Sequence, residues 1–154
     1  MKFLLIFLLP CLASGEILRL SKVVEAAGDR VTKYGYESGD EKKVIFVEDK
    51  AIVTEADVKL AMESGTQEHS VDISLTDEGG GKMAAATGAM RPGIDRIAIL
   101  IRGKVKSAPV VQSVPLGKNF IISGLDGEGE AAELAGLLSG KNKRQIHKEK
   151  AEEE

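Results

Sequence analysis

The chain has 154 residues, 43% of them hydrophobic and 4% aromatic, with a formal net charge of −3 at pH 7. This length fits one compact domain, and the hydrophobic fraction argues against a disordered chain and predicts a core of Val, Ile, Leu, Ala and Met. Lys and Arg are scattered along the chain, which leaves no concentrated positive field for phosphate groups, so nucleic acid is not an expected partner.

The N-terminus has the pattern of a secretory signal peptide. A basic start is followed by the apolar run 3–9 and then by small residues that end at Gly15, where we place the cleavage site. The apolar run is shorter than the roughly 20 residues that span a bilayer. We therefore expect export across the inner membrane to the periplasm or cell envelope, no integral membrane span in the mature chain, and a mature domain over 16–140.

Cys11 is the one cysteine of the chain. Its lipidation is an alternative to simple cleavage, although Pro10 directly before it fits a lipobox poorly. Cleavage after Gly15 removes Cys11, so the mature chain would carry no disulfide in an oxidising compartment. Its stability would then come from packing.

The first half of the mature chain favours strands and one helix. Residues 17–24 and 44–47 are predicted strands, and the polar stretch 33–43 between them is predicted to be an exposed connection. A helix is expected from Thr54 to near Gly65, because the sequence there has a capping-box pattern and then apolar residues at helical spacing.

Residues 70–75 give the clearest strand, since apolar and polar side chains alternate. Thr76 is suited to cap a second helix that runs to Ala86, and the two acidic residues after Thr76 favour the positive end of the helix dipole. The glycines at 79–81 argue against this helix, because each costs about 1 kcal/mol relative to Ala. We therefore expect an irregular first turn or compensating packing.

The second half of the chain predicts a hairpin, a short strand and a helix. Residues 96–101 and 104–111 are strands separated by two residues, the spacing of a tight hairpin, and Pro109 needs an edge or bulge position. A short strand is expected at 120–123. The next helix has one apolar face and is expected to end at Gly140, leaving 141–154 as a charged, solvated and disordered tail; that face comprises Ala131, Leu134, Ala135 and Leu138.

Together these elements predict an α+β domain with an antiparallel or mixed sheet and helices packed mainly on one face. Their order, and several short stretches, resemble the head region of the large periplasmic loop of the bacterial export subunit SecD and of fused SecDF proteins. The most specific stretch is IAILIRGKVKSAPVV at 97–111, which resembles the family's hairpin leading into Ser-Ala-Pro. The stretches 53–61 and 75–87 resemble its two first head helices, and 122–124 and the end of the last helix complete the likeness.

Two departures from the family bear on function. The family's hairpin turn commonly carries an acidic residue where this chain has Arg102. No hydrophobic segment follows Gly140, whereas SecD continues into the transmembrane helices that its proton-driven work requires, so we do not expect this chain to be that motor.

The resemblance implies a non-enzymatic extracytoplasmic binding or accessory module that contacts translocating polypeptide or export machinery, with no cofactor and no metal. The candidate polypeptide contact is the hairpin, where Arg102, Lys104 and Lys106 alternate next to Ser107. Such a row is more often solvated surface, but an unpaired strand edge can accept an added strand. Oligomeric state and partner stay open.

Two rival functions remain. The first is an envelope structural or interaction protein that reuses the fold with no role in export. A hydrolase that uses Ser107 and His69 has little support, because Ser107 lacks a nucleophile motif and nothing marks His69 as its base.

No catalytic, cofactor-binding or metal-ligating residues can be named. The relaxed glycine pattern at 127–132 is surrounded by acidic residues that would repel a phosphate.

Overall fold

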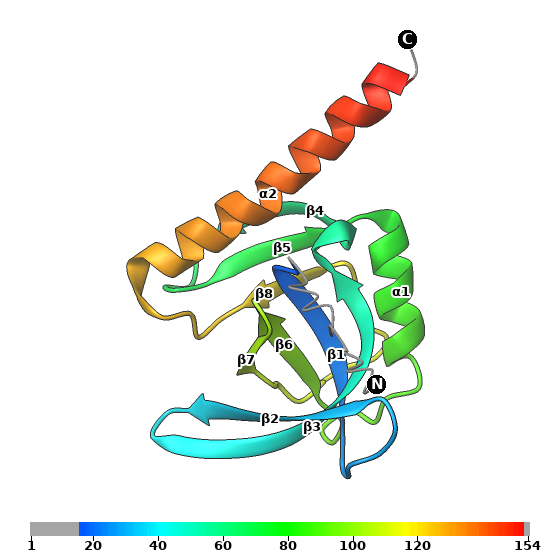
Figure 1. Ribbon diagram of the computed structural model, residues 1–154, viewed down its shortest axis with the longest axis vertical. Helices are drawn as coiled ribbons and strands as arrows, with labels where there is room; N and C mark the ends of the chain where they lie inside the picture. Colours follow the sequence, from blue (N-terminus) through cyan, green and yellow to red (C-terminus); the bar gives the residue numbers. More distant parts are fainter. Residues whose placement is uncertain (1–15, 153–154) are drawn as a thin grey trace, which may run out of the picture.

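The computed structural model describes residues 16–152, with side chains for 16–127 and 129–140. The predicted signal peptide and the lipidation alternative at Cys11 lie outside the described residues. The described chain forms two antiparallel sheets and two α-helices, arranged as in Figure 1.

The larger sheet has five strands in the order β2-β3-β1-β6-β7. Its strands are β1 (Leu18–Val24), β2 (Val31–Ser38), β3 (Glu41–Thr54), β6 (Ile97–Ile101) and β7 (Lys104–Ser107). The hairpin of β2 and β3 crosses below β6 and β7 (Figure 1).

The smaller sheet has three strands in the order β4-β5-β8. Its strands are β4 (Val58–Glu63), β5 (Val71–Leu75) and β8 (Asn119–Ile122). A 3-10 turn, η1 (Glu55–Asp57), joins β3 to β4, and α1 (Asp77–Thr87) follows β5 and packs at the side of the molecule beside β3, while α2 (Gly127–Glu152) lies along β4 (Figure 1). All pairings of named strands are antiparallel, so the α+β prediction is confirmed, with the strands divided between two sheets.

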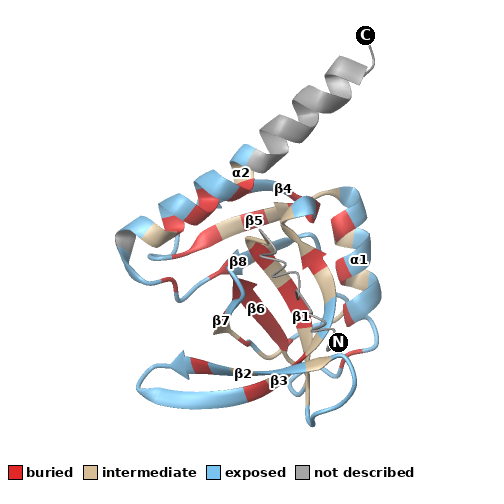
Figure 2. Cartoon of the chain, in the orientation of Figure 1, coloured by how far each residue is buried: buried red, intermediate tan, exposed pale blue. Residues whose placement is uncertain are grey.

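The strand β6 is buried on both faces because two cores flank the larger sheet. Successive side chains of a strand point to opposite sides, so Ile97, Ile99 and Ile101 join the main core, whereas Ala98 and Leu100 join a smaller one. The main core also takes in β5 and the inner faces of α1 and α2, and the smaller core is closed by β2 and β3. Figure 2 shows this burial concentrated in β1 and β6, with the β2–β3 hairpin mostly exposed.

The prediction of a helix from Thr54 to Gly65, and with it the likeness of 53–61 to a head helix, is wrong. The capping box of Thr54 and Asp57 is present, but it serves a single 3-10 turn, after which β4 begins. A register shift between Val58 and Leu60 turns the strand so that Val58 and Ala61 are both buried. This β-bulge places two residues three apart on one face and so imitates helical spacing.

The prediction that 33–43 is a loop is also wrong. Residues 33–38 belong to β2, 39–40 form a turn and 41–43 begin the 14-residue β3. The two strands pair from Val31–Glu48 to Ser38–Glu41. The side chains are mostly exposed, as their polarity suggests, and Tyr36 is the one buried residue of β2. The backbone of a polar hairpin is satisfied by strand pairing, which polarity alone does not reveal.

The prediction that Gly140 ends the last helix is wrong as well, because α2 continues to Glu152. A glycine cap requires positive φ, and Gly140 is not among the glycines that have it. Side chains beyond Gly140 are outside the described residues, so the solvated tail stays a prediction.

The remaining elements are confirmed with small changes of boundary. The strands predicted at 17–24, 70–75 and 120–123 are β1, β5 and β8, and the helix that Thr76 caps is α1. The hairpin's second strand ends at Ser107, so Pro109 lies outside it, next to an isolated bridge between Arg96 and Val110.

Candidate functional site

Close packing at the start of α1 accounts for two of the three glycines in this helix. A Cβ on Gly79 would lie 2.8 Å from the Cβ of Asp57 and 2.9 Å from its carbonyl oxygen, and one on Gly80 would lie 2.9 Å from the Cβ of Lys118. Only residues without a side chain allow this close approach. Gly81 has open space around it, so packing requires two of the three glycines.

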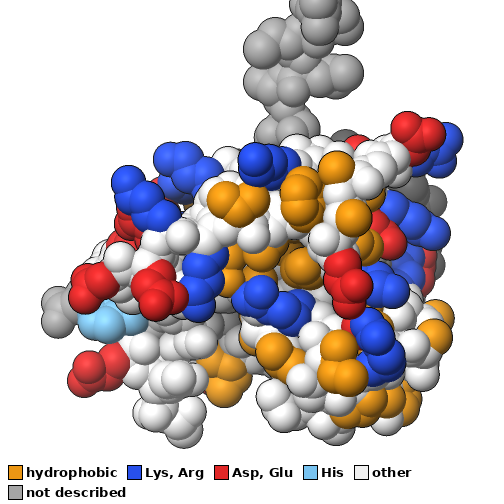
Figure 3. Space-filling model, turned by 90° about the horizontal axis from the view of Figure 1, so that it is seen from below, with side chains coloured by type: hydrophobic (Ala, Val, Ile, Leu, Met, Phe, Trp, Pro, Cys, Tyr) orange, Lys and Arg blue, Asp and Glu red, His pale blue; other side chains and the backbone are white. Residues whose placement is uncertain are grey.

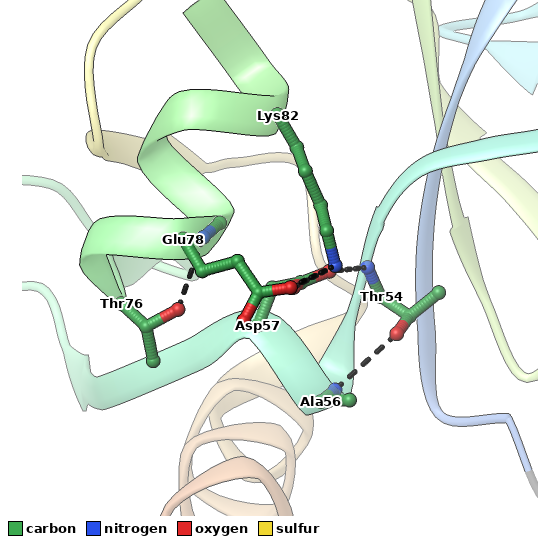
Figure 4. Close-up of polar contacts among 7 residues, drawn as sticks. Thr54, Ala56, Asp57, Thr76, Glu78 and Lys82 are labelled. Atoms are coloured by element: carbon green, nitrogen blue, oxygen red, sulfur yellow. Dashed lines mark hydrogen bonds and ion pairs between the residues drawn. The ribbon is translucent and has the colours of Figure 1, made fainter.

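Asp57 fastens this helix start to η1 (Figure 4). Its buried carboxylate accepts hydrogen bonds from the backbone N–H of Thr54 at 3.0 Å and from Nζ of Lys82 at 2.8 Å. Its carbonyl oxygen accepts from the N–H of Thr76, whose own hydroxyl caps Gly79 at 3.0 Å. The hydrogen bonds of Lys82 with Asp57 and Glu78 raise the pKa of the lysine.

Next to Asp57 and Lys82, residues of β3 and α1 line a hollow of about 730 Å³. Small and apolar residues line it together with three lysines; these residues are Ala51, Ile52, Ala85, Ala86, Met90, Lys22, Lys50 and Lys82. Asp57 and Glu48 offset the lysines, so the hollow has no strong charge of one sign.

The predicted contact residues lie on the hairpin of β6 and β7. Arg102 and Gly103 have φ of 51° and 77°, and positive φ at both central residues defines a type I′ turn. Arg102 tolerates this conformation while its N–H donates to the carbonyl of Ile17 at 3.0 Å and its guanidinium donates to Glu133 at 2.5 Å. The tight hairpin is therefore confirmed.

Two of the three predicted cations are already paired with acids at the start of α2. Nζ of Lys106 lies 2.8 Å from Asp126 and 2.8 Å from Glu130, and Arg102 pairs with Glu133. Desolvation by itself lowers the pKa of Lys106, but the hydrogen bonds with Asp126 and Glu130 outweigh it, so this pKa is raised. We call these contacts the hairpin–helix ion pairs.

The structure brings Arg102, Lys104 and Lys106 to one hollow of about 280 Å³ against α2, and Ser107 is not among the residues that line it. Lys104 is exposed and has no ion pair within the described residues. Of the three predicted hairpin cations, Lys104 is therefore unpaired, and Arg102 and Lys106 are paired with acids. Ser107 and His69 share no hollow or hydrogen bond in the described part of the chain; His69 lies with Glu63 and Glu68 instead.

Sequence reasoning missed the outer face of the smaller sheet. Leu60, Met62 and Ile121 point outward there, with exposed fractions of 45%, 51% and 45%, and Phe120 helps line a hollow of about 350 Å³ beside them. We call this surface the outer sheet face; it comprises Leu60, Met62, Asp72, Ser74, Asn119 and Ile121. Its signal in the sequence was the continuous apolar run 120–122, since a strand in a sheet with one buried face cannot bury three successive side chains.

The two edges of the smaller sheet differ. Along β4 runs α2, and the hydroxyl of Ser139 donates to the carbonyl of Ala61 at 2.7 Å. In the described residues no strand pairs with the outer edge of β8. The outer sheet face therefore adjoins an edge that has no strand partner among the described residues, and such an edge can accept another strand.

Charge on the surface is mixed. Figure 3 shows basic side chains among hydrophobic and acidic ones on the face seen from below. The mixture agrees with the composition, because the 21 Lys and Arg residues of the chain nearly balance its 24 Asp and Glu residues.

Two antiparallel sheets over a shared core, with exposed apolar side chains on one sheet face, define a small α+β module. The family model of the SecDF P1 head subdomain matches residues 15–141. The chain belongs to this family.

Two solved structures show the same fold. One is a crystal structure of SecDF in the super-membrane-facing form, with a TM-score of 0.59 and 22% identity over 80% of this chain. The other comes from a structural and functional study of SecDF as a membrane component that enhances protein export, with a TM-score of 0.58 and 21% identity over 80% of this chain.

The chain spans 18% of the first SecDF chain and 62% of the second. No curated protein matches it. Among the helices of the described residues, none has the length and hydrophobicity to cross a membrane.

Proposed function

We propose that this chain is an extracytoplasmic accessory module of protein export, which contacts extended polypeptide and performs no catalysis with a cofactor or otherwise. Its membership of the SecDF P1 head family supports the export role. The observation that carries the polypeptide contact is the outer sheet face, where Leu60, Met62 and Ile121 are exposed beside the free edge of β8.

Two physical effects favour an extended chain as the occupant of this surface. Backbone groups along an unpaired edge can hydrogen-bond an added strand whatever its sequence, and adjacent apolar side chains then reward alternate apolar residues. Removing apolar surface from water contributes about 25 cal/mol per Å². Backbone hydrogen bonds and burial of apolar side chains depend little on sequence, so they suit a module that binds many different exported polypeptides.

The hairpin residues Arg102, Lys104, Lys106 and Ser107 form a second candidate contact. Lys104 supports it, since its ammonium group is exposed and has no ion pair within the described residues. The hairpin–helix ion pairs weaken it, because an acidic partner of Arg102 or Lys106 would have to displace Glu133, Asp126 or Glu130.

In-cell photocrosslinking tests the proposal and separates the two surfaces. A photoreactive residue is placed at Ile121 or Met62 on the outer sheet face, at Lys104 on the hairpin, and at Val44 as an exposed apolar control on β3. We expect exported polypeptides or translocon subunits at Ile121 and Met62 and few at Val44.

If exported chains crosslink only at Lys104, the hairpin and not the outer sheet face is the polypeptide contact. Capture of a single unrelated envelope protein at every position would support an envelope structural protein with no role in export and would overturn the proposal. Proteolysis or ester hydrolysis that persists through purification and is lost in Ser107→Ala would instead indicate the hydrolase.

A further inference from the structure

The centre of the outer sheet face carries one charge, that of Asp72, without a protein partner within the described residues. In the register of the smaller sheet, Asp72 stands opposite Met62 on one side and Ile121 on the other. Residues directly opposite in a sheet share a face, so these three form a row with a carboxylate between two exposed apolar side chains. Within the described residues the Asp72 side chain has no hydrogen bond or ion pair.

The neighbouring row shows what a satisfied pair looks like. It comprises Leu60, Ser74 and Asn119, and the hydroxyl of Ser74 donates to the amide oxygen of Asn119 at 2.7 Å. The Ser74 hydroxyl and the Asn119 amide oxygen therefore keep each other as partners when this face is covered. The carboxylate of Asp72 has no such partner within the described residues, and its hydrogen bonds are to solvent.

A chain that covers Met62 and Ile121 must also cover Asp72. Burying a carboxylate without a partner carries a large desolvation cost, whereas a cation placed beside it gains an attraction that strengthens as water is excluded. The surface therefore favours an occupant that brings a positive charge flanked by apolar groups.

We infer that the outer sheet face selects extended polypeptide segments in which a Lys or Arg lies between apolar residues at alternate positions. Met62, Asp72 and Ile121 lie on three adjacent strands, so the segment we infer crosses the strands over this face. Alternate residues of an extended segment share one side, which places its apolar side chains on Met62 and Ile121 and its basic side chain on Asp72. This inference rests on the proposed function, since it names the class of polypeptide that the same surface takes.

The position of Asp72 also disfavours a second copy of this chain as the occupant. In a two-fold symmetric contact the residues at the centre of the patch face their own counterparts. Asp72 would then meet Asp72, and two unpaired carboxylates would be buried together. A basic segment of another polypeptide has no such conflict.

Matched peptides test the inference on the whole chain. Three peptides share the pattern apolar–Ser–X–Ser–apolar with a terminal Trp, and X is Lys, Gln or Glu. Because the chain has no Trp, the fluorescence of each peptide reports its binding. The proteins are the unchanged chain, Asp72→Asn, Asp72→Lys and the control Asp29→Asn, which removes an exposed carboxylate in the loop between β1 and β2.

We expect the Lys peptide to bind the unchanged chain about threefold to tenfold tighter than the Glu peptide, as for a single partly covered ion pair. Asp72→Asn should abolish the preference, Asp72→Lys should reverse it, and Asp29→Asn should keep it. Added salt should reduce the preference in the unchanged chain, which provides a test even if Asp72→Lys fails to fold.

Equal binding of the three peptides would overturn the charge selection and leave the polypeptide contact standing. No binding of any peptide, with no perturbation of the β8 amides by NMR, would overturn both. A concentration-dependent dimer that Ile121→Ser abolishes would assign the face to a second copy of the chain and also overturn the inference.

Discussion

The two α-helices start in different surroundings. At the start of α1, Asp57 is buried, and Gly79 touches it so closely that no side chain fits between them. At the start of α2, the acids that meet Lys106 and Arg102 include Asp126 and Glu133, whose side chains are 87% and 57% exposed. Both starts use charged contacts to fasten a helix to a neighbouring element.

This difference indicates where the fold is rigid. When the contacts of a buried carboxylate break, its buried partners lose hydrogen bonds that water cannot replace. In an exposed ion pair, water can take the place of either partner, and salt screens the attraction. We expect the α1 start to be a fixed part of the frame and the α2 start to respond to solution conditions.

The largest effect should come from Gly79→Ala. Its Cβ would lie 2.8 Å from the Cβ of Asp57 and 3.3 Å from that of Leu75, an overpacking expected to lower the free energy of unfolding by about 1–3 kcal/mol. Urea unfolding measures it. The matched control is Gly81→Ala, where open space and better helix propensity should raise stability by up to about 1 kcal/mol. Equal effects at both positions would contradict the close packing at Gly79.

Asp57→Ala should have the next largest effect. It removes the side-chain acceptor for the N–H of Thr54 and the buried partner of Lys82, and loss of such a cap costs about 1–2 kcal/mol. Asp57→Asn keeps an oxygen for the N–H of Thr54, so it should cost less in the same urea measurement. A cost for Asn as large as that for Ala would show that charge, and not the cap, dominates.

Lys106→Gln should have a smaller effect that depends on salt. It removes the contacts with Asp126 and Glu130, and we expect a loss below about 1 kcal/mol that shrinks as salt rises. Lys104→Gln is the control, because Lys104 has no ion pair within the described residues. A loss for Lys106→Gln that is unchanged in high salt would place the α2 start in the same class as the α1 start.

The smallest effect should be the pH dependence of Asp126. The hydrogen bond and charge of Lys106 hold the pKa of Asp126 below its ordinary value of 3.8. Because the folded-state pKa is the lower one, its stabilising effect is fully present above 3.8 and is lost as the pH falls through the folded-state value. The difference in Tm between the unchanged chain and Asp126→Asn should thus be present at neutral pH and vanish in acid. A difference that grew in acid would reverse the assigned sign.

Part of the fold could be predicted because some signals are local. The alternation at 70–75, the cap at Thr76 and the spacing around Arg102 and Gly103 each determine their element through contacts only a few residues apart. The pattern at Thr54 misled because a β-bulge in β4 produced helical spacing within a strand.

The candidate site was harder to predict for the same reason. The sequence indicated that Arg102, Lys104 and Lys106 share a hairpin, but their acidic partners lie between 20 and 31 residues further along the chain. The row of Met62, Asp72 and Ile121 depends on the register of three strands, and the register between distant strands has no local signal.

The sequence by itself determined the α+β class, the family likeness and the elements that local capping, turns and alternation specify. Tertiary structure alone decided that the strands form two sheets, that Gly79 must lack a side chain, that Arg102 and Lys106 are paired with acids and that Asp72 lies between apolar side chains on an open face. The physical reason is the range of the interactions. Hydrogen bonds within a turn are encoded by neighbours, whereas burial and charge pairing depend on which distant segments the folded chain brings together.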